Sequence, residues 1–506
     1  MATQEVLRPK GRSDRFAGLG RLPLSAAAFA ATGAATLAAY AALWLEPLWL
    51  GRFNPFTGEA LALGPILGLD VRGAGRYAVA AAAPMALYVA ALLLLPRVPA
   101  RTAWRVAIGV AVLAPVTLVY TYPALAADVF DYLMNGRVVS EYGMNPYTHP
   151  PLEFAADPYY PPVGWKGLPA VYGPVWIAVM AALTEVCGSN TLAALLATKA
   201  LSVGAHWAAA GTVYLLARRL TPGKELFAFV AHAWNPLAVI HFAVDGHNDS
   251  LLLLFLLAAV WLALDRRWEV AFPVLTLSVL VKFVPAVLFP LLLWQARREP
   301  RAALTGLAAS VLLAGMFFAP LWAGAATFDG VRDQASRSTS SLAAVADFYL
   351  PYAWLRPAAI AIFSLGFLAV LRRRLDVVRG SYWILLLYLL VLSFWTKAWY
   401  FTWVVGLGAA IGGGAFWVTV PGAIGLLAAN VVGGWAWPLN WFDWYGRGGL
   451  VTIEAALTAS TLGGWIVGLL AWAAGGRRRG RAAPSGAGAL PRPGGLRARR
   501  RRPRSI

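Results

Sequence analysis

Long apolar stretches follow one another along most of this chain, with short polar turns between them. Their Leu- and Ala-rich composition lacks the alternation of a β-strand, and most approach the roughly 20 residues that a membrane-spanning helix needs. Backbone polar groups in lipid must be satisfied within the segment, so the pattern predicts an all-α transmembrane bundle of about 12–14 membrane helices. The predicted helices cover 22–45, 77–95, 104–122, 191–217, 226–242, 251–264, 302–321, 349–371, 382–395, 401–415, 416–433 and 450–473.

Two further apolar stretches do not fit a simple crossing. Residues 175–186 are short for the bilayer core and follow a Tyr-Gly-Pro turn, which predicts a re-entrant or surface helix. Residues 270–294 have arginines on both sides and are interrupted by Lys282 and Pro285. A single crossing would not leave both basic ends on one side, so we expect a helical hairpin that dips into the membrane with Lys282 near its tip.

Composition and charge agree with a membrane protein. Of the 506 residues 59% are hydrophobic and 13% charged, and the mean hydropathy is +0.63. The formal net charge of +20 comes from arginines placed where cytoplasmic loops carry them, so we expect membrane lipids and no nucleic acid as partners. The single cysteine, Cys187, excludes an internal disulfide framework.

The basic residues also predict an orientation and a division of the chain. Residues 1–21 form a basic cytoplasmic N-terminus, 22–474 the membrane domain, and 475–506 a disordered basic cytoplasmic tail. A large loop at about 123–190 then lies on the extracytoplasmic face of the cell membrane. Carboxylates at a membrane edge must face water or a cavity, so this loop is the candidate active site.

Acidic residues open this loop. Asp128 and Asp131 share a helix face, with Tyr132 beside Asp128, and the two acids suit a general base or a metal ligand. One of them could instead cap the helix. Arg137 lies four residues before Glu141, which is typical of an ion pair, although a guanidinium also binds phosphate.

The rest of the loop is rich in Pro, Tyr and Trp. The segment Gly-Met-Asn-Pro-Tyr at 143–147 is a turn signal that ends the helix. The aromatic rings that follow suit a sugar-stacking surface, and they equally suit anchors at the membrane interface. Candidate substrate contacts in this loop are Tyr132, Asn145, Tyr147 and Tyr172.

A second polar cluster, Asp-Gly-His-Asn-Asp at 245–249, occupies a tight turn on the same predicted face. Short turns favour these residues in any protein. His247, together with Lys282, nonetheless offers donors suited to a phosphate group, and Lys397 is a further basic residue that could also be an interface anchor. Candidate substrate contacts here are Asn235, Asn248 and Asp249.

The order of these motifs resembles a known family. The motifs D-x-x-D-Y, G-R, G-x-N-P-Y, Y-G-P, W-N-P, G-H-N-D and K-x-x-P, between about 126 and 290, are similar to those of the polyprenol-phosphate-mannose-dependent mannosyltransferases, which have the C-type membrane glycosyltransferase fold. The resemblance implies a polyprenyl-phosphate sugar donor used on the outer face, a lipid-linked glycan or lipoglycan acceptor, and inversion at the sugar carbon.

The resemblance also implies roles for residues. Asp128 would be the catalytic base, Asp131 would assist or orient the acceptor, and His247, Lys282 and Lys397 would be candidates for binding the donor phosphate. Arg137 joins these candidates because of its guanidinium chemistry alone. The spaced D-x-x-D pair departs from the adjacent acids of many members and leaves metal dependence open, but we expect no cofactor or metal. Rival functions are a lipid-linked oligosaccharide polymerase or ligase, and a transporter or flippase of lipid-linked sugars.

Overall fold

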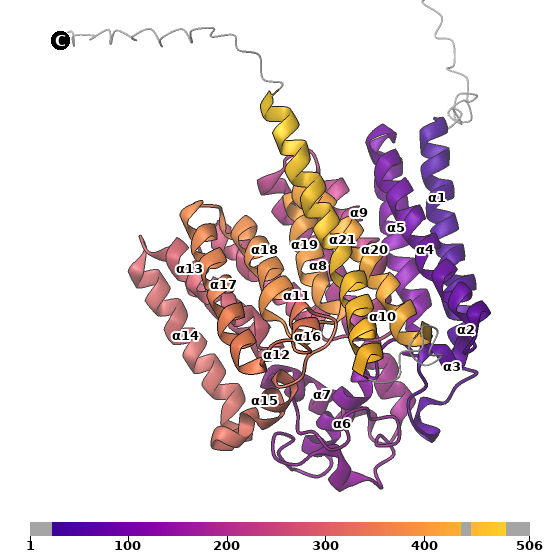
Figure 1. Ribbon diagram of the computed structural model, residues 1–506, viewed down its shortest axis with the longest axis vertical. Helices are drawn as coiled ribbons and strands as arrows, with labels where there is room; N and C mark the ends of the chain where they lie inside the picture. The colour runs from indigo at the N-terminus through magenta and orange to yellow at the C-terminus, as the bar shows by residue number, and fades with distance from the viewer. Residues whose placement is uncertain (1–22, 437–446, 482–506) are drawn as a thin grey trace, which may run out of the picture.

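The protein is described by a computed structural model that covers residues 23–436 and 447–481 (Figure 1). Within these ranges the chain is mainly helical, without β-strands, and isolated bridges join Trp49 to Thr121 and Thr339 to Trp395. The predicted all-α class is therefore confirmed.

Among the described residues, seven helices are long and apolar enough to cross a membrane, which makes this a multi-pass membrane protein. The first, α1, continues through a π-helical turn into α2 (Glu46–Leu48). These helices are α1 (Leu24–Tyr40), α4 (Val71–Leu94), α5 (Ala100–Val119), α8 (Thr191–Leu220), α14 (Pro300–Phe318), α17 (Tyr352–Arg372) and α20 (Gly413–Val431).

An eighth span is made of two helices that meet at an angle of 48°. The sequence predicted one straight helix over 226–242, but α9 (Glu225–Ala233) and α10 (Pro236–Ala243) are separated by Trp234 and Asn235. Proline at the first position of α10 lacks an N–H for the preceding turn, and the Asn235 side chain caps α10 by accepting from the Leu237 N–H at 3.0 Å.

Shorter apolar segments complete the bundle, and the predicted 12–14 membrane helices included most of them. They are α7 (Pro174–Cys187), α11 (Asp249–Leu264), α12 (Trp268–Val281), α13 (Phe289–Ala296) with the 3₁₀ turn Val284–Leu288 before it, α18 (Val377–Leu387), α19 (Thr402–Ile411) and part of α21 (Arg447–Arg481).

The predicted hairpin is confirmed in α12 and α13. Lys282 follows α12 in an extended conformation, and the 3₁₀ turn then leads into α13. Arg266, which precedes α12, forms a salt bridge with Glu299, which follows α13. The chain therefore returns to the end of the bundle where it started, and Lys282 lies between the two arms.

Several segments that do not cross the bundle gather at one end of it (Figure 1). Helices α6 (Asp128–Ser140), α7, α15 (Asp329–Ala335) and α16 (Leu342–Ala346), with α3 (Leu63–Leu67), lie at the lower end in this view. The start of α1 and the end of α21 lie at the opposite end. Helices α6 and α7 therefore lie at the end of the bundle opposite the start of α1 and the end of α21.

The outermost helices present apolar side chains to the surroundings. Only 6% of the spanning window of α17 and 17% of that of α14 is buried within the molecule. Such surfaces are expected of helices that face lipid. The predicted tail (475–506) needs one correction, because α21 continues to Arg481; its remainder, 482–506, and the predicted N-terminal segment 1–21 lie outside the described residues.

Candidate active site

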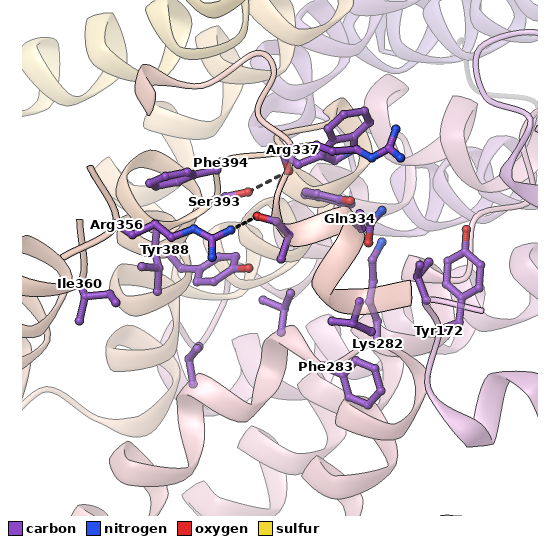
Figure 2. Close-up of a pocket in the computed structure, with 18 of the residues that line it drawn as sticks. Tyr172, Lys282, Phe283, Gln334, Arg337, Arg356, Ile360, Tyr388, Ser393 and Phe394 are labelled. Carbon is purple, nitrogen blue, oxygen red and sulfur yellow. Dashed lines mark hydrogen bonds between the residues drawn. The ribbon is translucent and has the colours of Figure 1, made fainter. Parts of the chain in front are cut away.

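A cavity of about 390 Å³ opens where α6, the hairpin tip, α15, α17 and the segment after α18 meet (Figure 2). Ile360 and Arg356 lie toward one end in this view, and Lys282 and Tyr172 toward the other. Three residues predicted from the sequence line it, namely Asp128, Tyr172 and Lys282. The structure thus brings together an acid and a cation that are far apart in the chain.

Asp128 is the first residue of α6, and its side chain is free of a capping role. Ala127 occupies the N-cap position without a side-chain hydrogen bond, so the capping interpretation of Asp128 is wrong. Burial raises the pKa of Asp128 to about 6, against the lowering effect of the nearby cations. The facing charges are Lys282 and Lys397, which lower this pKa, and Asp249 and Asp245, which raise it. A carboxyl group with this pKa suits a base that works near neutral pH.

Asp131 lies one turn further along α6 and outside the main cavity. Its side chain is buried, and its Oδ1 accepts a hydrogen bond from the Trp165 backbone N–H at 2.9 Å. Burial, followed by the charge of Asp128, raises the pKa of Asp131 well above its ordinary value. The two acids therefore differ, because Asp131 is buried and holds the loop through the Trp165 N–H, while Asp128 faces the cavity.

Lys282 is held in place by a buried partner. Its Nζ lies 3.1 and 3.2 Å from the carboxylate oxygens of Asp249, whose Oδ1 also accepts from the Trp403 indole N–H at 2.9 Å. The ammonium group also lies 4.2 Å from the centre of the Tyr400 ring. Asp249 was predicted to contact substrate, but the structure places it fully buried beneath Lys282, where it fixes the cation.

His247 is buried beside Asp128 rather than exposed to a ligand. Its ring stacks on Trp399 at a centroid distance of 4.1 Å, and its Nδ1 lies 3.8 Å from Asp128 Oδ2 and 3.2 Å from the Tyr132 hydroxyl. Burial lowers the pKa of His247 well below its ordinary value, so a neutral ring is favoured. This geometry does not support His247 as a cation for phosphate. The Tyr132 hydroxyl donates to Asn248 Oδ1, and neither Tyr132 nor Asn248 lines the cavity.

A group of side chains with metal-ligand atoms lies next to His247 in the described part of the chain. His241, Asp245 and His247 offer one such atom each within 4.8 Å of one another, and all three are buried. His241 Nδ1 and Asp245 Oδ2 are already paired at 2.9 Å. Gly246, between Asp245 and His247, has a φ of +69°, which glycine adopts readily and which lets the turn close. The contact between His241 and Asp245 thus stabilises the turn that carries His247.

Four predicted site residues have structural roles away from the cavity. The Arg137 guanidinium forms salt bridges with Glu141 at 2.8 Å and with buried Asp157 at 3.2 Å. The amide of Asn145 donates to the Leu321 carbonyl, and the Tyr147 hydroxyl donates to the Tyr172 carbonyl. Asn235 caps α10, as described above. These contacts hold the loop and the bent span together.

Lys397 lies behind the aromatic wall of the cavity. Its Nζ is 4.4 Å from the centre of the Trp395 ring, and Trp395 lines the cavity. Burial lowers the pKa of Lys397, while the charges of Asp128 and Glu454 oppose this effect. Lys397 therefore contributes positive charge near Asp128 without being one of the cavity-lining residues.

Several residues of the cavity wall were not predicted from the sequence. Gln334 and Arg337 belong to α15 and the segment after it, Arg356 to α17, and Tyr388 to the end of α18. Arg356 donates to the Ala335 carbonyl, which links α17 to α15 (Figure 2). None of these residues lies in a recognisable motif. Arg356 is a charged residue within an apolar helix, which is a hint of function, whereas Gln334 and Arg337 lie in the polar stretch 329–341.

These features define a helical, multi-pass membrane protein with a carboxylate and a fixed cation in one cavity at an end of the bundle. The family described as alpha-(1->6)-mannopyranosyltransferase, N-terminal domain, matches residues 30–298, more than half of the chain. The chain belongs to this family. The match includes Asp128, His247 and Lys282, but ends before the cavity residues from α15, α17 and the segment after α18.

Individual relatives match over shorter stretches. The chain is 32% identical over 155 residues to alpha-(1->6)-mannopyranosyltransferase B of Corynebacterium glutamicum, covering 30% of this chain and 25% of the relative. It is 25% identical over 187 residues to enzyme A of the same organism, covering 35% and 36%. It is 27% identical over 193 residues to enzyme A of Mycobacterium tuberculosis, covering 37% and 36%. The matched part thus spans about a quarter to a third of these relatives.

Proposed function

We propose that the protein is an integral-membrane α-mannosyltransferase that moves mannose from a polyprenyl-phosphate donor to a lipid-linked glycan acceptor. The observation that carries the proposal is the cavity in which Asp128 and Lys282 meet. The relatives, named as alpha-(1->6)-mannopyranosyltransferases, support mannose as the sugar and a 6-hydroxyl as the acceptor group.

Asp128 acts as the base in this proposal. The acceptor hydroxyl oxygen forms a bond to the anomeric carbon of mannose while its proton passes to the Asp128 carboxylate. The bond between the anomeric carbon and the phosphate oxygen breaks, and the phosphate leaves with the electron pair. Because attack and departure occur on opposite faces of the sugar carbon, a single displacement inverts its configuration. A base whose pKa is near 6 is ionised at pH 7 and accepts the proton there.

Lys282 stabilises the phosphate as negative charge develops on it. Its salt bridge with Asp249 fixes the ammonium group before substrate arrives, and fixed charges stabilise a transition state without reorganisation. An ammonium group has three donors, and Asp249 is a single carboxylate, so a donor remains for the phosphate. Lys397 adds positive charge nearby, and these two cations let us propose that the transfer needs no metal.

The lipid part of the donor fits the other cavity wall. Val284 and Val287 of the 3₁₀ turn, Leu392 after α18 and Ile360 of α17 line this side. Helix α17 is largely unburied within the molecule, so this apolar wall adjoins a lipid-facing helix. We place the site on the extracytoplasmic face, because the basic connections between helices are expected in the cytoplasm.

A donor comparison tests the proposed function. Purified protein in lipid nanodiscs is given a lipid-linked mannoside acceptor and either labelled polyprenyl-phosphate mannose or a labelled sugar-nucleotide mannose. We expect labelled product only with the polyprenyl donor, and unchanged yield when EDTA is present. Product from the nucleotide donor would refute the donor assignment, and movement of the lipid-linked sugar across the bilayer without transfer would favour a flippase.

A further inference from the structure

Two tryptophans from distant parts of the chain meet at the cavity. Trp165 belongs to the loop after α6, and Trp395 to the segment after α18; their rings are 5.8 Å apart at an angle of 64°. We call them the tryptophan pair. A cation lies over each ring, since the Arg337 guanidinium is 5.2 Å from the centre of the Trp165 ring and Lys397 Nζ is 4.4 Å from that of Trp395.

One member of the tryptophan pair, Trp395, lines the cavity that holds the proposed base, and Trp165 lines a small pocket next to it. Trp395 and Arg337 line the cavity with Asp128, and Gln334 lines it beside them. Both tryptophans are half-buried, so part of each ring remains accessible. The Arg337 guanidinium is held by Asp333 through two nitrogens at 2.8 and 3.2 Å. The pair is therefore a supported aromatic surface with polar donors at its margin.

Asp131 connects this surface to the helix that carries the base. Its Oδ1 accepts from the Trp165 backbone N–H at 2.9 Å, and it lies three residues from Asp128 on α6. Asp131 itself lines a separate small pocket of about 10 Å³ and does not line the main cavity. Its position accounts for a second acid in the motif without a role in proton transfer.

The chemistry of this surface fits a sugar ring. An indole offers a flat apolar face with a polar edge, and binding sites for small molecules combine such faces with a few placed polar groups. The amide of Gln334 and the guanidinium of Arg337 are suited to hydrogen bonds with sugar hydroxyls. The apolar valines and Leu392, by contrast, suit the lipid of the donor.

We propose that Trp395, backed by Trp165, binds the terminal sugar of the glycan acceptor, and that Asp131 is a positioning residue for this surface. The inference rests on the proposed sugar transfer. In a displacement the acceptor approaches opposite the leaving phosphate, so it lies on the side of the base. The tryptophan pair is on that side, because Asp131 joins it to α6.

The first test separates the two substrates. Transfer is measured while acceptor and donor are titrated in turn, for wild type and for Trp395→Leu, Trp395→Phe and Trp354→Leu. Trp354 is 72% exposed on α17 and does not line the cavity, which makes it the matched control. We expect Trp395→Leu to raise the acceptor KM at least tenfold with little change in donor KM, and Trp395→Phe to restore most of the affinity. A raised donor KM with an unchanged acceptor KM, or no change in either, would overturn the proposal.

The role of Asp131 is tested by the same titrations. Asp131→Ala removes the acceptor of the Trp165 N–H and should raise the acceptor KM in the same direction as Trp395→Leu. Asp131→Asn keeps an oxygen at this place and should restore the acceptor KM. An acceptor KM that stays normal in Asp131→Ala, with only kcat or expression reduced, would contradict a positioning role.

A direct binding assay tests the acceptor surface even if no transfer is observed. A fluorescent α-(1->6)-linked mannose oligosaccharide is titrated with purified protein, without donor, and followed by polarisation. We expect wild type and Trp354→Leu to bind and Trp395→Leu to lose at least tenfold in affinity. Absence of binding by wild type at millimolar protein concentration would refute the acceptor surface. Binding without transfer would refute only the proposed reaction.

Discussion

Lys282→Met is the perturbation whose consequence follows most directly from the structure. The substitution keeps the length and apolar stem of the side chain but removes the charge next to Asp249. The Asp249 carboxylate is fully buried and would keep the hydrogen bond from the Trp403 indole N–H. Removing one partner of a buried ion pair leaves an uncompensated charge.

The expected loss can be bounded. Breaking a buried pair costs about 3–5 kcal/mol. The Lys282 side chain is 14% exposed, so the pair is slightly hydrated, and we expect the lower end, about 3 kcal/mol. Adding Asp249→Asn removes the stranded charge and keeps an oxygen for the Trp403 N–H. The double variant should therefore regain most of the stability, but not the transfer, because the cation for the phosphate is still missing.

The assay combines a denaturant titration in detergent with mannosyl transfer in membranes. Lys224→Met, at an exposed position before α9, is the matched control and should change the free energy of unfolding by no more than about 0.5 kcal/mol. An unchanged stability of Lys282→Met would refute the buried pair. Restored transfer in the double variant would refute the role of Lys282 at the phosphate.

Three other outcomes follow from the site and the loop. The rate of transfer should fall as pH drops through about 6, because protonated Asp128 cannot accept a proton; a pH profile that stays flat from 5 to 8 would argue against this base. Arg137→Gln should lower the free energy of unfolding by about 3 kcal/mol, since it strands buried Asp157, yet leave the donor KM unchanged in the folded fraction. Gly173→Ala should sharply reduce the yield of folded protein, because its Cβ would lie 2.1 Å from a backbone oxygen of α12, whereas Gly167→Ala meets nothing within 4 Å and should purify normally by size-exclusion chromatography.

The sequence was sufficient for the class of protein and for the unusual hairpin. Apolar length and the absence of period-2 alternation determine a helical membrane bundle, and arginines at both ends of one apolar run required that the chain return. The Arg266 to Glu299 salt bridge confirms this return. The position of Asp128 at the cavity could also be anticipated, because a carboxylate at the start of a polar helix next to an apolar span must face water or a cavity.

The remaining cavity residues could not be predicted because tertiary packing selects them. Arg337 follows the polar helix α15 and Arg356 lies in the apolar helix α17, and neither belongs to a motif. Only the tertiary fold brings them to the cavity that the hairpin tip also lines. His247 had the right residue type for a phosphate contact, but burial against Trp399 gives it another environment. Asp249 is likewise buried and paired with Lys282. The sequence does not indicate which side chains of this turn face inward.

The central claim is that Asp128 is the base for mannosyl transfer, and one comparison tests it most directly. Transfer from labelled polyprenyl-phosphate mannose is measured in membranes with matched amounts of wild type, Asp128→Asn and Asp329→Asn; the last removes an exposed acid that does not line the cavity. The account predicts that Asp128→Asn loses at least a hundredfold in rate, in line with the usual contribution of a general base, while Asp329→Asn transfers as wild type does. Transfer by Asp128→Asn at the wild-type rate would contradict it.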